Sequence, residues 1–294
     1  MQPIHIAALL SASIIWGGGF ALNRVAAPYF GPIVLVEMRL LLAGLLLLGW
    51  AAWLGRGLEW RKHWKLYLVL GATNAAIPFA MIAYSVQHIG ASFATIINST
   101  TVPLSALLAL WILGERLTPV RLAGMAVGLL GVVVLVGWSP VPLTLEAWLG
   151  IAAMLLASVC FAFSNVYTKR ASDGAPLLGI VTGQLLMGAA LFVPPSAFTL
   201  PSQPPPLEAW LALLGITVLA TAMANLLYFY LIEQVGPLQA SSVGFLVPMF
   251  GVLFGVVFLR EPFTWSIAAG MALILLSVAL VSGVVRPRAA QGGM

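Results

Sequence analysis

Residues 90–118 read GASFATIINSTTVPLSALLALWILGERLT, and residues 236–264 read GPLQASSVGFLVPMFGVLFGVVFLREPFT. Both stretches begin with Gly, interrupt an apolar run with Pro (Pro103 and Pro248) and end in a charged hairpin that closes on Thr. The two copies begin 146 residues apart. Solenoid and propeller repeats have periods of about 20–50 residues, so this spacing predicts one large unit that is duplicated.

The composition predicts a membrane protein. Hydrophobic residues make up 62% of the chain and charged residues only 7%, whereas ordinary soluble domains carry about 25% charged residues. The net charge is +5, but the basic residues are spread over several short loops rather than gathered in one patch. This distribution argues against a nucleic-acid partner and makes the lipid bilayer the expected surroundings.

Ten apolar segments are long enough to cross a hydrocarbon core of about 30 Å. The connections between them are short, which leaves no room for a soluble catalytic domain. The segments lie near 4–23, 33–54, 66–86, 92–113, 119–137, 147–168, 177–196, 209–232, 238–259 and 265–285.

The basic residues predict the orientation. If the N-terminus is cytoplasmic, the cytoplasmic connections and tail hold ten of the thirteen Lys and Arg residues, as the positive-inside rule expects. These are Arg56, Arg61, Lys62, Lys65, Arg116, Arg121, Lys169, Arg170, Arg286 and Arg288.

The two copies are separated by five segments, an odd number, so equivalent helices would cross in opposite directions. We therefore predict an all-α integral membrane protein with ten transmembrane helices in two inverted-topology five-helix repeats. The repeats would span 1–137 and 147–286, followed by a cytoplasmic tail at 287–294. Inverted repeats are typical of secondary transporters, whose substrate site lies near the midplane between the halves. The alternative is a duplication that only enlarges a helical bundle.

Polar and aromatic side chains recur on one face of several segments, where they are costly unless they face a cavity or a partner. The alternative for each is a role in joining helices without any ligand. Helix breaks at Pro78, Pro103 and Pro248 are expected to supply backbone groups for the substrate and to act as hinges. The predicted substrate-binding residues are Trp16, Asn23, Asn74, Met81, Tyr84, Asn98, Phe161, Asn165, Asn225, Tyr228 and Phe245.

Two charged residues lie within the second segment. Arg39 near a membrane midplane costs about 3 kcal/mol; it can snorkel to the interface, bind carbonyl groups or meet an anionic substrate, and we favour the structural roles because long side chains commonly snorkel. Glu37 faces nearly the opposite side of the helix and is the candidate coupling residue for protons. Glu115 and Glu261 are interpreted as hairpin residues near helix starts.

Several functions lack their sequence signals. The chain has no GxxxxGK[ST] phosphate loop, no His/Cys cluster for a metal and no acid–base constellation for catalysis. We expect no cofactor, no metal and no enzyme activity. Cys160 is the single cysteine, so no intramolecular disulfide can form. The sequence is compatible with a monomer.

The residues also carry a family resemblance, through Trp16-Gly17-Gly18-Gly19-Phe20, Arg39-Leu40-Leu41-Leu42-Ala43 and the two blocks from Pro to Glu. The chain resembles the drug/metabolite transporter (DMT) superfamily with two EamA-type domains, and within it the YddG-type exporters of aromatic amino acids. The resemblance implies ten helices in two inverted halves, cytoplasmic termini, and export of small metabolites across a bacterial plasma (inner) membrane. The superfamily's four-helix drug/proton antiporters use a first-helix carboxylate, which is missing here.

The expected function is therefore a facilitative or weakly coupled secondary transporter that exports small metabolites, including aromatic amino acids, by alternating access. The alternative is proton-coupled efflux of multiple drugs or cationic compounds, with Glu37 as the coupling group. A membrane enzyme or a lipid-facing scaffold is a third class.

Overall fold

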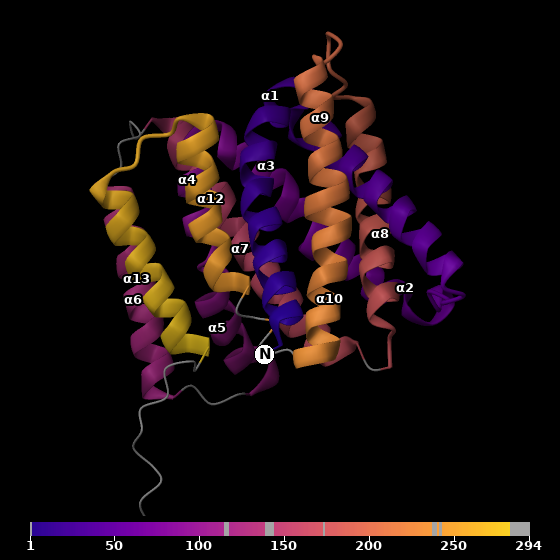
Figure 1. Cartoon of the computed structure of the whole chain (residues 1–294), viewed down its shortest axis with the longest axis horizontal. Coiled ribbons are helices and arrows are strands. Elements are labelled where there is room, and N and C mark those ends of the chain that lie inside the picture. The colour runs from indigo at the N-terminus through magenta and orange to yellow at the C-terminus, as the bar shows by residue number, and fades with distance from the viewer. Residues whose placement is uncertain are drawn as a thin grey trace, which may run out of the picture.

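The computed structural model describes residues 2–114, 118–138, 144–172, 174–236, 240 and 243–282, except the side chains of 229, 233 and 245. Within these residues every regular element is a helix (Figure 1), as expected where each backbone polar group must be satisfied without water. The elements are α1 (Pro3–Trp53), α2 (Trp60–Leu70), η1 (Gly71–Ala76), α3 (Ile77–Ile89), α4 (Ala91–Asn98), α5 (Thr101–Leu113), α6 (Pro119–Gly137), α7 (Leu145–Ala171), α8 (Leu177–Ala197), α9 (Leu207–Gly215), η2 (Ile216–Met223), α10 (Ala224–Val235), α12 (Val243–Leu259) and α13 (Trp265–Ser282).

Helix α1 contains the first two predicted segments as two arms. Gly31, with φ 71° and ψ 158°, is non-helical, and a positive φ of this kind is readily adopted by Gly. At 1.5 Å per residue the 51 residues of α1 reach about 76 Å, more than twice a hydrocarbon core. The predicted loop at 24–32 is therefore mostly helical, and the chain turns at Gly31.

Seven helices in the described residues are long and apolar enough to cross a membrane, judged by length and composition, and α1 counts once among them. Two shorter apolar helices lie at Leu246–Leu259 and Trp265–Val281. The all-helical membrane fold is thus confirmed, whereas the count of ten spans remains a prediction.

Three predicted segments are interrupted within their length. The segment from α2 to α3 passes through the π-helix η1, the segment from α9 to α10 passes through the π-helix η2, and α4 is separated from α5 by a turn at Ser99–Thr100. Proline removes a donor and clashes with the carbonyl four residues earlier. For this reason η1 precedes Pro78 and the turn at Ser99–Thr100 precedes Pro103, rather than lying at the prolines themselves.

Glycines allow α6 and α13 to approach closely, and these helices lie side by side at the left of Figure 1. A Cβ at Gly124, Gly128 or Gly131 of α6 would meet Leu280, Ser277 or Ile274 of α13. Small residues at such spacing are the usual means by which membrane helices associate. The two helices are the fifth and the tenth of the predicted segments.

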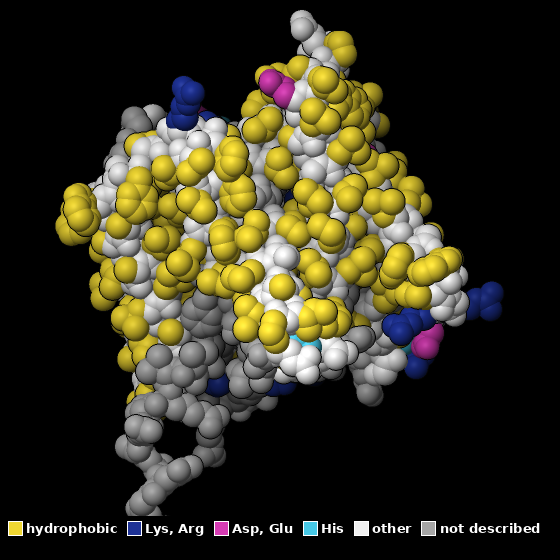
Figure 2. Space-filling view, viewed as in Figure 1, with side chains coloured by type: hydrophobic (Ala, Val, Ile, Leu, Met, Phe, Trp, Pro, Cys, Tyr) yellow, Lys and Arg dark blue, Asp and Glu magenta, His cyan; other side chains and the backbone are white. Residues whose placement is uncertain are grey.

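The outer surface is apolar. Figure 2 shows hydrophobic side chains over the broad middle of the visible face, with charged side chains at its margins. Exposed residues include Leu129 at 69% and Phe258 at 70%. Apolar exposure on this scale marks a surface that lies against lipid.

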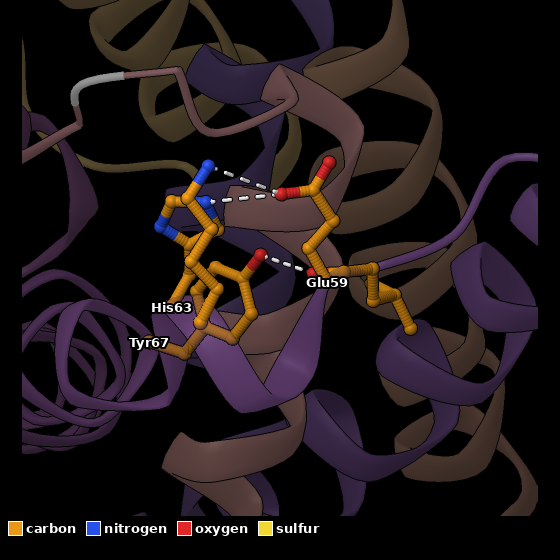
Figure 3. A network of polar contacts seen from close by, with 5 residues as sticks. Glu59, His63 and Tyr67 are labelled. Atoms are coloured by element: carbon orange, nitrogen blue, oxygen red, sulfur yellow. Dashed lines mark hydrogen bonds and ion pairs between the residues drawn. The ribbon is translucent and has the colours of Figure 1, made fainter.

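Charged side chains gather at the start of α2 (Figure 3). Glu59 lies 3.6 Å from Lys62 Nζ and 3.3 Å from His63 Nε2, while the Tyr67 hydroxyl donates to the Leu58 carbonyl. The ring of Tyr67 is fully buried, and a Cβ at Gly183 of α8 would collide with it. The buried ring, rather than the exposed ion pair, holds this loop against α8.

Candidate functional site

The two π-helices lie at matching places in the two halves of the chain. η1 (Gly71–Ala76) and η2 (Ile216–Met223) begin 145 residues apart, close to the 146-residue offset between the Gly-to-Thr stretches. A π-helix widens the turn and often marks a functional site. In η2 the Thr221 hydroxyl donates to the Ile216 carbonyl at 2.9 Å, which satisfies an acceptor inside the widened turn.

Arg39 in the second arm of α1 reaches η2. Its Nε donates to Thr221 Oγ1 at 2.6 Å, and its guanidinium carbon lies 3.9 Å from the centre of the Phe79 ring. The residue is only 5% exposed. Among the described residues the guanidinium makes no other hydrogen bond and no ion pair, so a buried cation is held by a hydroxyl and an aromatic face.

Aromatic and amide side chains contact the same groups that hold this cation, η2 and Phe79. The rings of Trp16 and Tyr228 have centroids 5.2 Å apart, and Trp16 Nε1 donates to the Ala220 carbonyl of η2 at 3.0 Å. Asn225 Nδ2 donates to the Thr221 carbonyl at 2.5 Å. Phe79, whose ring faces the guanidinium, also contacts Phe161 of α7, with ring centroids 6.1 Å apart.

We call these residues the central cluster, because each is linked to the next by a hydrogen bond or a ring contact through η2 or Phe79. The cluster joins both arms of α1, α3, α7, η2 and α10. It consists of Trp16, Arg39, Phe79, Phe161, Thr221, Asn225 and Tyr228.

Four of the predicted binding residues, Trp16, Phe161, Asn225 and Tyr228, thus meet in one cluster. Three others make contacts outside it. Asn74 donates to Gln184 Oε1 of α8 at 3.0 Å, Tyr84 stacks on His88 at 4.2 Å, and exposed Asn165 donates to Ser105 at 3.3 Å.

The remaining predicted residues show different surroundings. Asn23 donates to Gly19 within α1, and its Oδ1 and that of Asn98 are buried without a hydrogen-bond partner among the described residues. Met81 packs between the two largest hydrophobic clusters. The side chain of Phe245 lies outside the described residues, and half-buried Glu37 makes no hydrogen bond within them.

Three cluster members were not predicted as binding residues. The sequence marks Arg39 as an intramembrane charge but favours structural roles for it. Thr and Phe are ordinary residues in an apolar helix, so the sequence does not single out Thr221 or Phe79. The position of η2, which the local sequence does not mark, is what brings Thr221 to Arg39.

Cavities lie near the basic loops in the described part of the chain. One of about 350 Å³ lies between the end of α1, the start of α8 and α10, and includes Trp50, Arg56 and Tyr230 in its lining. Another, of about 240 Å³, lies between α5, α6, α7 and α13 and is lined by Ser105, Arg121, Asn165 and Lys169 among others. Asn165 therefore belongs to a basic cavity rather than to the central cluster.

Glu261 connects the two halves elsewhere. Its carboxylate accepts from the backbone N–H groups of Ala91 at 2.6 Å and Ser92 at 2.8 Å, the first two residues of α4. A carboxylate at a helix N-terminus is favourable because those N–H groups have no acceptor within the helix. The expected location near a helix start is thus correct, but the helix belongs to the other half. Glu115 lies outside the described residues.

Proteins of known sequence align along nearly the whole chain. The Uncharacterized transporter YvbV of Bacillus subtilis (strain 168) is 28% identical over 278 residues, covering 92% of this chain and 88% of the relative. The Uncharacterized inner membrane transporter YedA of Escherichia coli (strain K12) is 26% identical, covering 94% and 89%. Protein PecM of Dickeya dadantii (strain 3937) is 25% identical, covering 93% and 90%.

A protein of known crystal structure shares the fold, with a TM-score of 0.68 and 20% identity over 95% of this chain and 96% of the other. The EamA-like transporter family matches twice, at residues 3–137 and 148–283. Together these matches cover most of the chain, and two of the three relatives above are named as transporters. The chain is therefore a multi-pass membrane protein of the EamA-like transporter family, within the drug/metabolite transporter superfamily.

Proposed function

We propose that this protein is a secondary transporter that exports small metabolites, amino acids with aromatic side chains among them, by alternating access. The observation that carries the proposal is the central cluster. It combines aromatic faces at Trp16, Tyr228 and Phe161 with hydrogen-bonding groups at Arg39 and Asn225, and it lies where both halves of the chain meet. An amino acid has the same two parts, an aromatic or apolar side chain and a charged polar end.

The contacts between the halves support alternating access. The first arm of α1 packs against η2 and α12, and α7, its counterpart in the second copy, packs against η1, α3, α4 and α5. Each half thus packs against the other through equivalent elements. Rocking of one half against the other would exchange these equivalent contacts, which is the usual movement of transporters built from inverted repeats.

The alternative, proton-coupled efflux of cationic compounds through Glu37, is less well supported. A cationic substrate in the central cluster would meet the buried guanidinium of Arg39, and like charges repel strongly where water is scarce. Glu37 lies two positions from Arg39 and, in a helix, on nearly the opposite face.

The proposal is tested with the purified full-length protein in liposomes. Vesicles loaded with unlabelled phenylalanine should accumulate labelled phenylalanine by exchange, without ATP and without a pH gradient. The double variant Trp16→Ala/Tyr228→Ala should abolish the exchange. If the protein exchanges no amino acid but moves a lipophilic cation in response to a pH gradient, the alternative is correct.

We also propose that both termini face the cytoplasm of a bacterial cell. In a Cys160→Ala background, single cysteines at positions 115 and 261 should react with a membrane-impermeant maleimide from opposite sides. Reaction of both from one side would rule out the inverted arrangement.

A further inference from the structure

The buried cation of the central cluster lacks a charged partner in the described part of the chain. Arg39 is 5% exposed, and a guanidinium has five N–H donors. One of these, on Nε, is bound by Thr221. The aromatic face of Phe79 at 3.9 Å compensates part of the charge, but the four donors on the two Nη atoms have no acceptor among the described residues. Charged groups inside a membrane usually mark a functional site for this reason.

The second half of the chain provides an internal comparison. Aligning Arg39-Leu40-Leu41-Leu42 with Gln184-Leu185-Leu186-Met187 matches the offset of 145 between the two family matches. Leu40 and Leu185, which follow the polar residues, are 0% and 2% exposed. Arg39 and Gln184 therefore occupy equivalent positions, and each reaches the π-helix of the other half.

At Gln184 the contact between the helix and the π-helix is made by neutral groups. Gln184 is 6% exposed, and its Oε1 accepts from Asn74 of η1 at 3.0 Å. The corresponding contact at the other π-helix, η2, is made by Arg39 and Thr221. An amide pair is sufficient to join a helix to a π-helix at this position, so joining the helices does not require the positive charge at Arg39.

We infer that Arg39 binds the carboxylate of the transported substrate. The inference rests on the proposed transport function and names the substrate class: a small carboxylate with an aromatic or apolar body. A planar guanidinium binds a carboxylate through two parallel N–H groups. Thr221 and Phe79 fix the Nε edge and one face of the guanidinium, which leaves the two Nη atoms for this contact. The body of the substrate then lies against the aromatic rings of the cluster.

The first test compares ligands that share the phenyl ring but differ in whether they carry a carboxylate. Binding of phenylalanine, phenylalaninamide, phenethylamine and phenylacetate to the purified wild-type protein is measured by calorimetry. Phenylalanine and phenylacetate should bind about 10- to 100-fold more tightly than the amide and the amine, the range expected for a hydrogen-bonded charge pair. Equal binding of acid and amide, or a preference for the amine, overturns the inference.

The second test removes the charge while keeping the helix contact. Arg39→Gln/Thr221→Asn replaces the charged contact at η2 with a neutral amide pair like that of Gln184 and Asn74, and it should lose the preference for the acid over the amide. Gln184→Asn is the matched control, because it alters the equivalent neutral contact and should keep that preference. If the double variant does not fold, Arg39→Lys, which retains the charge but not the planar fork, should reduce the preference. A preference unchanged in either folded Arg39 variant contradicts the inference.

The outcomes separate this inference from the proposed function. Exchange of amino acids with an acid preference that survives Arg39→Gln/Thr221→Asn keeps the function and removes the role of Arg39. Failure to exchange any amino acid, together with Arg39-dependent binding of phenylacetate, removes amino acid transport and keeps the carboxylate site.

Discussion

The two π-helices occupy equivalent places but are built differently. η1 is tied to neighbouring helices by neutral pairs: Asn74 with Gln184 of α8, and Thr73 with Ser164 of α7 at 2.8 Å. η2 instead receives Arg39 at a side chain and Trp16 at a backbone carbonyl, both from α1. The first region is joined by neutral pairs, whereas the second holds a buried charge whose Nη donors have no acceptor among the described residues. The π-helix thus has a structural role in the first copy, as η1. We propose that in the second copy, as η2, it takes part in substrate binding.

The largest effect is expected where η1 packs against α8. A Cβ at Gly71 would meet backbone atoms of Gly188 and Gln184, which cannot move independently, whereas a Cβ at Gly215, beside η2, would meet the flexible side chain of Leu22. Gly71→Ala should destabilise the protein by roughly 2 kcal/mol. Gly215→Ala should change the stability by less than about 1 kcal/mol, because the contact with Leu22 is offset by the higher helix propensity of Ala. Thermal unfolding in detergent measures both. Equal shifts for the two variants would show that the joints are equally tight.

The neutral pair should behave as a pair. Asn74→Leu leaves the Gln184 amide buried without its partner and should cost about 1–3 kcal/mol. Asn74→Leu/Gln184→Leu removes both polar groups and should cost less than the sum of the two single changes. If the stability losses of the two single variants simply add in the double variant, the hydrogen bond between Asn74 and Gln184 contributes no stability of its own.

The contact of Glu261 with α4 should contribute somewhat less to the stability of the protein than the Asn74–Gln184 pair. Glu261→Gln removes the negative charge from two backbone donors and should destabilise the protein by about 1–2 kcal/mol. Glu208→Gln is the matched control, because Glu208 accepts a hydrogen bond from the Tyr29 hydroxyl in an exposed place, and it should cost roughly 0.5 kcal/mol. A larger loss at Glu208 would contradict the assigned role of Glu261.

The smallest effect is expected at Trp16. Trp16→Phe keeps an aromatic face against Tyr228 but loses the hydrogen bond to the Ala220 carbonyl of η2, which is worth about 1 kcal/mol. Thermal unfolding should shift slightly, and exchange of phenylalanine should persist. If exchange is abolished, the indole N–H acts on the substrate rather than on η2.

The sequence predicted the membrane class, the all-helical fold and the family because these depend on composition and on a long duplicated pattern. It identified helix interruption near Pro78 and Pro103 but placed each break at the proline. The break expected at Pro248 is wrong, because α12 continues as a helix through this residue. The strain of a proline falls on the preceding turn, so the π-helix and the turn at Ser99–Thr100 begin earlier in the chain. The loop expected at 24–32 is wrong because here a proline does not interrupt the helix. Pro28 lies within a helical arm, and the chain turns at Gly31.

The candidate site was less predictable. Asn225 and Tyr228 were predicted as binding residues on one helical face, and both lie in the central cluster. Asn74 was on an equally polar face, but its partner Gln184 lies 110 residues away in sequence, and local periodicity carries no information about such a contact. Arg39 was visible as an intramembrane charge, yet only the position of η2 shows which groups it meets.

The position of Glu261 also constrains how this end of the protein can open. Its carboxylate satisfies two N–H groups at the beginning of α4, and no carbonyl within that helix can replace it. If α12 separated from α4, three strongly polar groups would be uncovered together, and solvent would have to hydrate them. Wetting of this end and parting of the two helices would therefore be one event.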